Sequence, residues 1–361
     1  MSSSNAQEKS YFQALSTLTL APTRAEQLYP WFSALNTPEF EDFVALADCN
    51  HVVLRALIPL QTVGEQHGDA PLAARCRQRI EQEQLRIANA LRHLFQIATA
   101  LESAGCATTV MKTLEHWPDF GSDLDLYTTA SAQQICRVMS TRFGTKTEPQ
   151  SWGDRLASKW NFAIPGLPEA VEVHVQRLGQ TGEHTAIAQR FVSRRVRQSL
   201  QGMEFMVPAP EERIVVATLQ RMYRHFYFRL SDVVNIAALV ESGVVDFVEL
   251  HRAASLGGIW KGVCSLLRIV SDYVLAYRGT PVVLPSEVLT DALFGGEKVF
   301  IKARFLRVPI VPHGIELYTA QVTTAALRGD LAGTFRLSLL PYLASAAAIS
   351  YKLTGSDKGI W

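Results

Sequence analysis

The feature that most constrains the fold is a short block of strand-like segments between two long helical regions. Before residue 104, and again after about residue 181, apolar residues recur at steps of three and four, which is typical of amphipathic helices. Between these limits, short β-branched or alternating segments predict strands at residues 108–111, 124–127, 159–164 and 171–175. A helical pattern covers residues 132–143. We therefore expect an α+β fold in which a small mixed sheet is flanked by helical regions.

Three regions follow from these patterns: a helical N-terminal region at 1–104, an α/β core at 105–180 and a helical C-terminal region at 181–361. The last N-terminal helix presents one apolar face and ends at Gly105, a residue type that often follows a helix. In the C-terminal region, Pro208 and Pro210 precede two glutamates and predict a helix start. The periodic segment 214–240 then predicts one long helix.

Composition narrows the class of protein. The 361 residues are 48% hydrophobic and 19% charged, which is typical of a globular chain. A formal net charge of +1 excludes a uniformly basic surface of the histone type. The five cysteines lack C-x-x-C spacing, so neither a disulfide framework nor a thiolate zinc site is expected. Reduced, buried thiols are the expectation instead.

The chain shows no signal for a membrane or for export. Its first residues have neither a basic segment nor an apolar segment of the kind found in signal peptides. The longest apolar stretch, 337–351, contains Pro341 and is shorter than the roughly 20 residues that span a bilayer. We expect a cytoplasmic protein with no membrane span, and a buried helix near the C-terminus.

The strongest chemical signal is the pair Asp123 and Asp125 in the segment 121–127. Residues two apart on a strand point to the same face, so the two carboxylates project together while Leu124 and Leu126 point into the core. Adjacent carboxylates repel unless a cation lies between them. Mg²⁺ takes one or two carboxylates together with substrate phosphates. The alternative is a solvated turn leading into a strand.

A third acid favours the metal interpretation. Glu172 lies in the alternating segment 171–175, on the same face as His174, with three valines on the opposite face. Two-metal phosphoryl transfer needs about three carboxylates, of which one polarises the attacking hydroxyl. Asp123, Asp125 and Glu172 are therefore the candidate catalytic and metal-binding residues.

Segments 110–113, 121–126 and 171–174 together resemble the DNA polymerase β-like nucleotidyltransferase superfamily. Within it, the chain is most similar to nucleotidyltransferase family 5, a bacterial branch, and the similarity extends from the region around 47–51 to about residue 240. The resemblance implies that Asp123, Asp125 and Glu172 bind Mg²⁺, that Glu172 acts as base, and that Lys112 lies near the nucleotide phosphates.

The chain departs from the superfamily pattern in one place. Upstream of the two aspartates, where the superfamily has Gly-Ser or Gly-Gly against the triphosphate, this chain has Thr113 and Leu114. Gly121 and Ser122 directly precede the aspartates instead, and Ser122 is included among the candidate nucleotide-binding residues.

Basic residues complete the candidate site. Arg221, Arg224 and His225 follow helical spacing, and Arg229 and Asp232 continue the stripe. The functional interpretation is a clamp on nucleotide phosphates or on an RNA backbone; the alternative is a solvated basic face. A second cluster, Arg194, Arg195 and Arg197, is predicted to be solvated surface.

We therefore expect an enzyme that uses Mg²⁺ to move a nucleoside monophosphate from an NTP to a hydroxyl on a small molecule, a protein or an RNA end. Motifs of other chemistries, such as a Walker loop, a G-x-S-x-G elbow or H-E-x-x-H, are absent from the sequence. Two alternatives stay open: a toxin-like nucleotidyltransferase acting on tRNA or protein, and a non-catalytic binding protein with a relic core.

Overall fold

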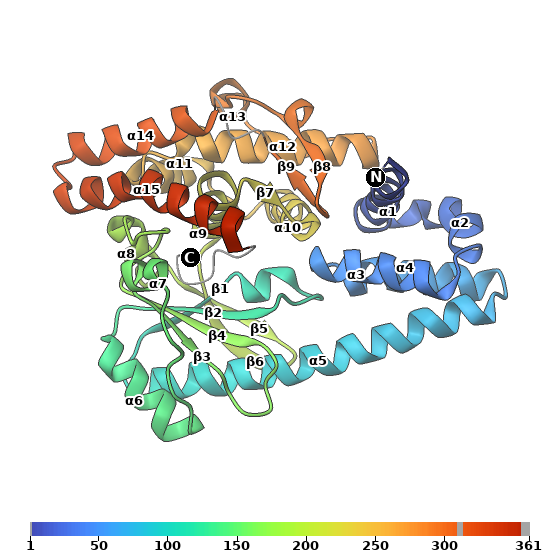
Figure 1. Cartoon of the computed structure of the whole chain (residues 1–361), viewed down its shortest axis with the longest axis horizontal. Coiled ribbons are helices and arrows are strands. Elements are labelled where there is room, and N and C mark those ends of the chain that lie inside the picture. The colour runs from blue at the N-terminus through green and yellow to red at the C-terminus, as the bar shows by residue number, and fades with distance from the viewer. Residues whose placement is uncertain (1, 309–312, 355–361) are drawn as a thin grey trace.

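The computed structural model describes residues 2–308 and 313–354, and its architecture is α+β, as predicted. Figure 1 shows a small sheet above the long helix α5, with the N-terminal helices at one end and the C-terminal helices on the side opposite α5. One hydrophobic cluster runs through the whole arrangement, from Phe12 through Leu94, Leu126 and Val173 to Leu267.

The N-terminal region is helical, as predicted. Its elements are α1 (Ser2–Leu20), η1 (Pro22–Leu28), α2 (Tyr29–Ser33), α3 (Thr37–Cys49), α4 (Val53–Gln66) and α5 (Ala70–Ser103). Helix α3 begins with a capping box: the side chain of Asn36 accepts from the backbone N–H of Glu39, and the Glu39 carboxylate accepts from that of Asn36, each at 3.0 Å. Asp69 caps α5, which ends just before Gly105.

The central sheet follows the predicted segments closely. Its elements are β1 (Thr108–Met111), η2 (Thr113–His116), β2 (Asp123–Thr128), α6 (Ala132–Phe143), α7 (Trp152–Ala157), β3 (Lys159–Phe162) and β4 (Ala170–Val175). The strand order is β1-β2-β4-β3, with β2 and β4 parallel and both outer pairs antiparallel. The sheet is therefore mixed, and its central parallel pair carries the acidic segments.

The C-terminal region contains strands that the helical periodicity did not predict. Its elements are α8 (Thr185–Ser193), β5 (Val196–Leu200), β6 (Met203–Val207), α9 (Pro210–Thr218), η3 (Leu219–His225), β7 (Tyr227–Phe228), α10 (Leu230–Glu241), α11 (Phe247–Leu256), α12 (Trp260–Arg278), α13 (Ser286–Asp291), η4 (Gly296–Lys298), β8 (Phe300–Lys302), β9 (Phe305–Arg307), α14 (His313–Leu327) and α15 (Leu331–Thr354). The hairpin β5–β6 turns at Gln201 and Gly202, both at positive φ, as a two-residue hairpin loop with the favoured twist requires.

The single helix predicted at 214–240 is interrupted, so that prediction is wrong. Helix α9 ends at Thr218, a π-helical turn occupies 219–225, and Phe226 adopts a left-handed conformation. The next residues form β7, which pairs antiparallel with β9. The partner strand lies far away in the sequence, so local periodicity carries no sign of the break. Single π-helical turns of this kind are frequent at functional sites.

The C-terminal helix is also less buried than predicted. In α15, Leu337 is buried, but Phe335, Tyr342 and Ile349 are exposed. Among the helices of residues 2–308 and 313–354, none combines the length and the apolar character needed to cross a bilayer. The five cysteines are free thiols, as predicted, but only Cys76, Cys106 and Cys264 are buried, whereas Cys49 and Cys136 are half-buried.

Candidate functional site

Strand β2 carries both aspartates on one face. Leu124 and Leu126 are fully buried on the other face, while Asp123 is half-buried at the start of the strand and Asp125 is buried. Thr113, which precedes β2 in the sequence, holds this strand in place through two hydrogen bonds. Its hydroxyl accepts from the backbone N–H of Asp125 at 2.9 Å and donates to the backbone carbonyl of Asp123 at 3.3 Å. The hydroxyl of Thr113 thus fixes the backbone of β2 beside the segment that precedes it.

The parallel register of β2 and β4 brings Glu172 beside Asp125, because these two residues are direct Cα partners. His174 follows on the same face of β4, with Nε2 at 3.4 Å from Asp125 Oδ1 and 3.9 Å from Glu172 Oε2. One ligand atom from each of these three residues lies within 4.8 Å of the others. Two carboxylates and an imidazole at this spacing fit a divalent cation.

Asp123 adds charge to the edge of this cluster. Its burial, then the negative charges of Glu172 and Asp125, raise the pKa of Asp123 above its usual value. The Ser122 hydroxyl lies 3.2 Å from Asp123 Oδ2. The structure therefore places Asp123, Asp125 and Glu172 around one region. His174 lies closer to Asp125 and Glu172 than the sequence alone indicated.

Two lysines balance the acids. Lys112 Nζ lies 2.5 Å from Asp125 Oδ1, and Lys159 Nζ lies 3.1 Å from Glu172 Oε1 and 2.9 Å from Asp154 Oδ1. Burial works against ionisation of Asp125, but the charge of Lys112 and a hydrogen bond from His174 hold the pKa of Asp125 below its usual value. The expectation that only a bound cation could hold the carboxylates together is therefore incomplete, since ammonium groups already do so. Lys159 was not among the predicted site residues.

The acids open onto a central cavity of about 210 Å³. Its charged and titratable lining includes His51, Lys112, Glu115, His116, Asp123, Asp125, Lys159, Glu172, Arg221, Arg224, His225, Arg229 and Asp232. The basic stripe was predicted on one continuous helix, but its members come from different parts of the chain. Arg221, Arg224 and His225 lie in the π-helical turn, Arg229 directly precedes α10, and Asp232 lies within α10. These residues face the acids even though the predicted helix is broken.

Arg221 is the most buried of these basic groups, with only 2% of its surface exposed. Its Nε lies 2.7 Å from Asp232 Oδ2, while Nη1 has no hydrogen-bond partner. An unpartnered guanidinium nitrogen that lines a cavity is a donor suited to an anion. Arg224, half-buried beside it, supplies a second guanidinium to the same space.

Three histidines complete the lining in their neutral form. Burial, together with the surrounding arginines, lowers the pKa of His51 and of His225, and burial lowers that of His116 to about 4. The rings of His51 and His116 lie 5.1 Å apart in an edge-to-face arrangement. The family resemblance included the segment that contains His51, but nothing in the sequence gave this residue a role.

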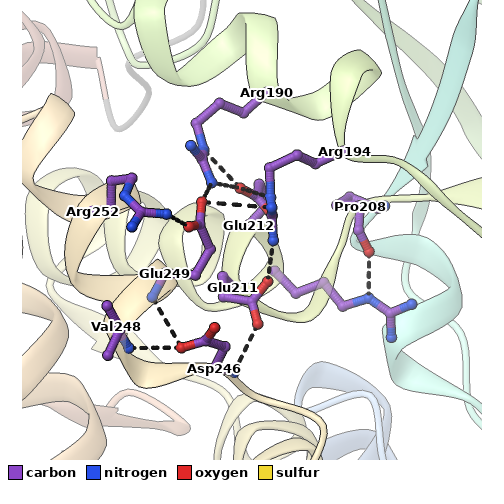
Figure 2. A network of polar contacts seen from close by, with 10 residues as sticks. Arg190, Arg194, Pro208, Glu211, Glu212, Asp246, Val248, Glu249 and Arg252 are labelled. Atoms are coloured by element: carbon purple, nitrogen blue, oxygen red, sulfur yellow. Dashed lines mark hydrogen bonds and ion pairs between the residues drawn. The ribbon is translucent and has the colours of Figure 1, made fainter.

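A network of ion pairs fixes the position of the helix that leads to Arg221 and Arg224 (Figure 2). Glu212, at the start of α9, is fully buried and accepts from Arg190 Nε at 2.7 Å; Arg194 Nη2 lies 3.0 Å from Glu211 Oε2. Glu249 of α11 pairs with Arg190 as well. Helices α8, α9 and α11 are thereby tied together.

The prediction that Arg194, Arg195 and Arg197 form a solvated cluster is wrong for two of the three. Arg194 belongs to the ion-pair network, and Arg195 pairs with Glu102 and donates to the backbone carbonyl of Thr108 at 2.9 Å. Arg197 alone is well exposed, with 69% of its side chain accessible.

Comparison with known proteins adds little to this geometry. No protein-family model matches the chain, and no curated protein sequence matches it either. Among solved structures, it is similar to an antigenic nucleotidyltransferase-like protein from Paracoccidioides brasiliensis, at 16% identity over 57% of this chain and 97% of that chain, with a TM-score of 0.34. It is also similar to a tRNA-processing enzyme in an apo form, at 11% identity over 75% of this chain and 68% of that chain, with a TM-score of 0.24. TM-scores of this size carry no argument about function, and membership of nucleotidyltransferase family 5 stays a prediction.

Proposed function

We propose that this chain is a metal-dependent nucleotidyltransferase, which moves a nucleoside monophosphate from an NTP to a hydroxyl acceptor. One observation carries the proposal: Asp125 and Glu172, which with His174 form the acid–imidazole cluster, line the same cavity as Arg221 and Arg224. Carboxylates suited to a cation and guanidiniums suited to phosphates are the two halves of a nucleotide–metal site.

In this proposal, Asp123, Asp125 and Glu172 hold Mg²⁺, with His174 as a fourth donor. A bound divalent ion supplies charge neutralisation at the α-phosphate and lowers the pKa of the attacking hydroxyl. The side chains of Lys112, Arg221 and Arg224 bind the phosphates, and Ser122 donates to a phosphate oxygen at the edge of the cavity. The same proposal includes a cytoplasmic location, because the cytoplasm supplies the NTP.

The transfer then proceeds by displacement at the α-phosphorus. The acceptor oxygen forms a bond to that phosphorus, and its proton passes to the carboxylate of Glu172. The bond from the α-phosphorus to its bridging oxygen breaks, and pyrophosphate leaves with the electron pair. The fixed guanidiniums stabilise the negative charge that accumulates on the phosphate oxygens.

Replacing Arg224 with alanine tests the phosphate half of the proposal. Charge-assisted hydrogen bonds contribute about 1.5–3 kcal/mol each, so Mg²⁺–NTP should bind about tenfold more weakly, as measured by titration calorimetry. Arg197→Ala is the matched control, because Arg197 is exposed and pairs with Glu204 on the hairpin β5–β6. Equal affinities for the wild type and both variants would show that Arg224 does not contribute to nucleotide binding.

Catalysis itself is tested by incubating the purified chain with each α-labelled NTP and a cell extract. Label should pass to an acceptor in the wild type and not in Asp125→Asn. A chain that binds Mg²⁺–NTP but transfers no label with any NTP would instead be the non-catalytic binding protein.

A further inference from the structure

A second cavity opens beside the central one. It has a volume of about 420 Å³, within the range of small-molecule sites, and shares His51, Gly121, Ser122 and Arg229 with the central cavity. The proposed phosphate and metal groups do not line its far side, which Glu169, Phe120 and Phe305 form instead. The two cavities therefore meet beside Asp123, where an acceptor would need to reach the α-phosphate.

Two residues that line this second cavity each carry a buried polar atom without a hydrogen-bond partner. Glu169 is 3% exposed; its Oε1 accepts from Arg86 Nη1 at 2.5 Å, but its Oε2 has no hydrogen-bond partner. His51 is 8% exposed and its Nδ1 is likewise unpartnered. Leaving a buried polar atom without a partner is unfavourable, so such atoms often mark the place of a ligand's polar groups.

The position of His51 is tightly defined. The residue has a φ of +54°, which is uncommon for a side chain other than glycine. A Cβ at Gly121 would lie 3.0 Å from His51 Cε1 and 3.2 Å from Nδ1, so the imidazole packs directly against the glycine backbone. The ring is thus held at the junction of the two cavities.

The charges around the second cavity balance. Asp48 and Glu169 oppose Arg86 and Arg229, and His51 is neutral. The proposed phosphate region of the central cavity instead brings together three cationic side chains, those of Lys112, Arg221 and Arg224. A balanced lining does not favour a polyanion such as an RNA end. Phe120, Phe305 and Pro168 add apolar surface of the kind that packs against the C–H face of a sugar ring.

We propose that the second cavity binds the hydroxyl acceptor, and that this acceptor is a small neutral polyol such as a monosaccharide or a cyclitol. The inference rests on the proposed nucleotidyltransferase function. Glu169 Oε2 accepts a hydrogen bond from one hydroxyl, and His51 Nδ1 bonds a second. A third hydroxyl then lies toward Asp123 and the central cavity, where its oxygen attacks the α-phosphorus and its proton passes to Glu172 as pyrophosphate leaves.

Saturation-transfer NMR on the full chain, with glucose, ribose and myo-inositol as separate probes, tests the proposal. We expect transfer to at least one probe in the wild type, and roughly tenfold weaker binding in Glu169→Gln, because the loss of a charged acceptor removes a strong hydrogen bond. Glu204→Gln is the matched control on an exposed glutamate. Mg²⁺–NTP binding, measured by calorimetry, should be the same in Glu169→Gln as in the wild type.

Alkylation of Cys49 with N-ethylmaleimide gives a test that does not depend on a variant's folding. Cys49 lines the second cavity and is half-buried, as Cys136 is elsewhere, so a Cys136→Ser background restricts the label to this site among the accessible thiols. Alkylation should abolish transfer to the sugars, and Cys49→Ser should make the chain insensitive to the reagent.

Three results would overturn the proposal. Absence of transfer to all three probes in the wild type would do so, and intact Mg²⁺–NTP binding would then leave the proposed function standing. Sugar binding that survives alkylation would place the sugars elsewhere. Displacement of the sugars by a short oligoribonucleotide would assign the cavity to an RNA end. Loss of Mg²⁺–NTP binding in the wild type would mark failure of the proposed function itself.

Discussion

Asp123 lies where the charges of Glu172 and Asp125 oppose its own, so its ionised form is unfavourable in the folded chain. Asp123→Asn keeps the side-chain shape and removes one charge, and we expect the variant to be as stable as the wild type or slightly more so. Mg²⁺–NTP should raise the melting temperature of the wild type by about 2 °C or more and should do little for the variant. A variant that is markedly less stable, in a chain whose wild type shows no metal-dependent shift, would make the carboxylate structural.

His116 predicts a pH dependence of stability. Burial lowers its pKa to about 4, so between the unfolded value of about 6.5 and pH 4 the folded chain binds fewer protons than the unfolded chain. The free energy of unfolding should therefore decrease as the pH falls through this window, by about 2 kcal/mol at pH 5.

His116→Gln should remove that contribution. The measurement is the difference in unfolding free energy between wild type and variant at pH 7 and at pH 5. The difference is needed because burial raises the pKa of Asp119 to about 7, and this carboxyl stabilises the fold as the pH falls. A difference that does not change with pH would show that His116 has an ordinary pKa in the folded chain.

The residues that sequence analysis placed correctly are those whose environment is set locally. Asp123 and Asp125 share a face because they alternate with buried leucines, and Glu172 joins them because its strand alternates in the same way. Lys159 and His51 reach the same cavity from other segments, and no local pattern records that approach. The sequence therefore indicated the acids and the basic residues Lys112, Arg221, Arg224 and Arg229, whereas Lys159 and His51 were missed.

At the scale of elements, the same distinction separates correct from incorrect predictions. Strands β1 to β4 carry alternating or β-branched segments, so their positions were predicted within about two residues. The break at 219–228 was missed because it depends on pairing between β7 and β9. The apolar periodicity continues across the break because apolar side chains are buried both before it, in α9, and after it, in α10.

The ion-pair network of Figure 2 gives a prediction for these elements. Glu212→Gln leaves two guanidiniums beside a neutral group at a fully buried position, and should lower the free energy of unfolding by about 2 kcal/mol. Denaturant titration measures the change. Glu204→Gln breaks an exposed pair with Arg197 and should change stability by less than about 1 kcal/mol. Equal effects of the two substitutions would contradict a structural role for the buried network.

At the scale of the whole molecule, the division into regions 1–104, 105–180 and 181–361 stays a prediction. The hydrophobic cluster includes residues from all three, so we expect them to unfold together. Thermal unfolding followed by far-ultraviolet circular dichroism and by tryptophan fluorescence should give coincident transitions. Two separated transitions would instead support independently folding domains.

The network around Glu212 also bears on how a substrate would meet this protein. Helix α8 contacts β1 of the acidic sheet, and through Arg190 it holds α9, which leads directly into Arg221 and Arg224. The two halves of the proposed site are therefore preorganised during folding rather than assembled on arrival of the nucleotide. Binding to such a surface loses little conformational entropy in the protein, and its enthalpy reflects mainly the exchange of water for phosphate at donors already in place.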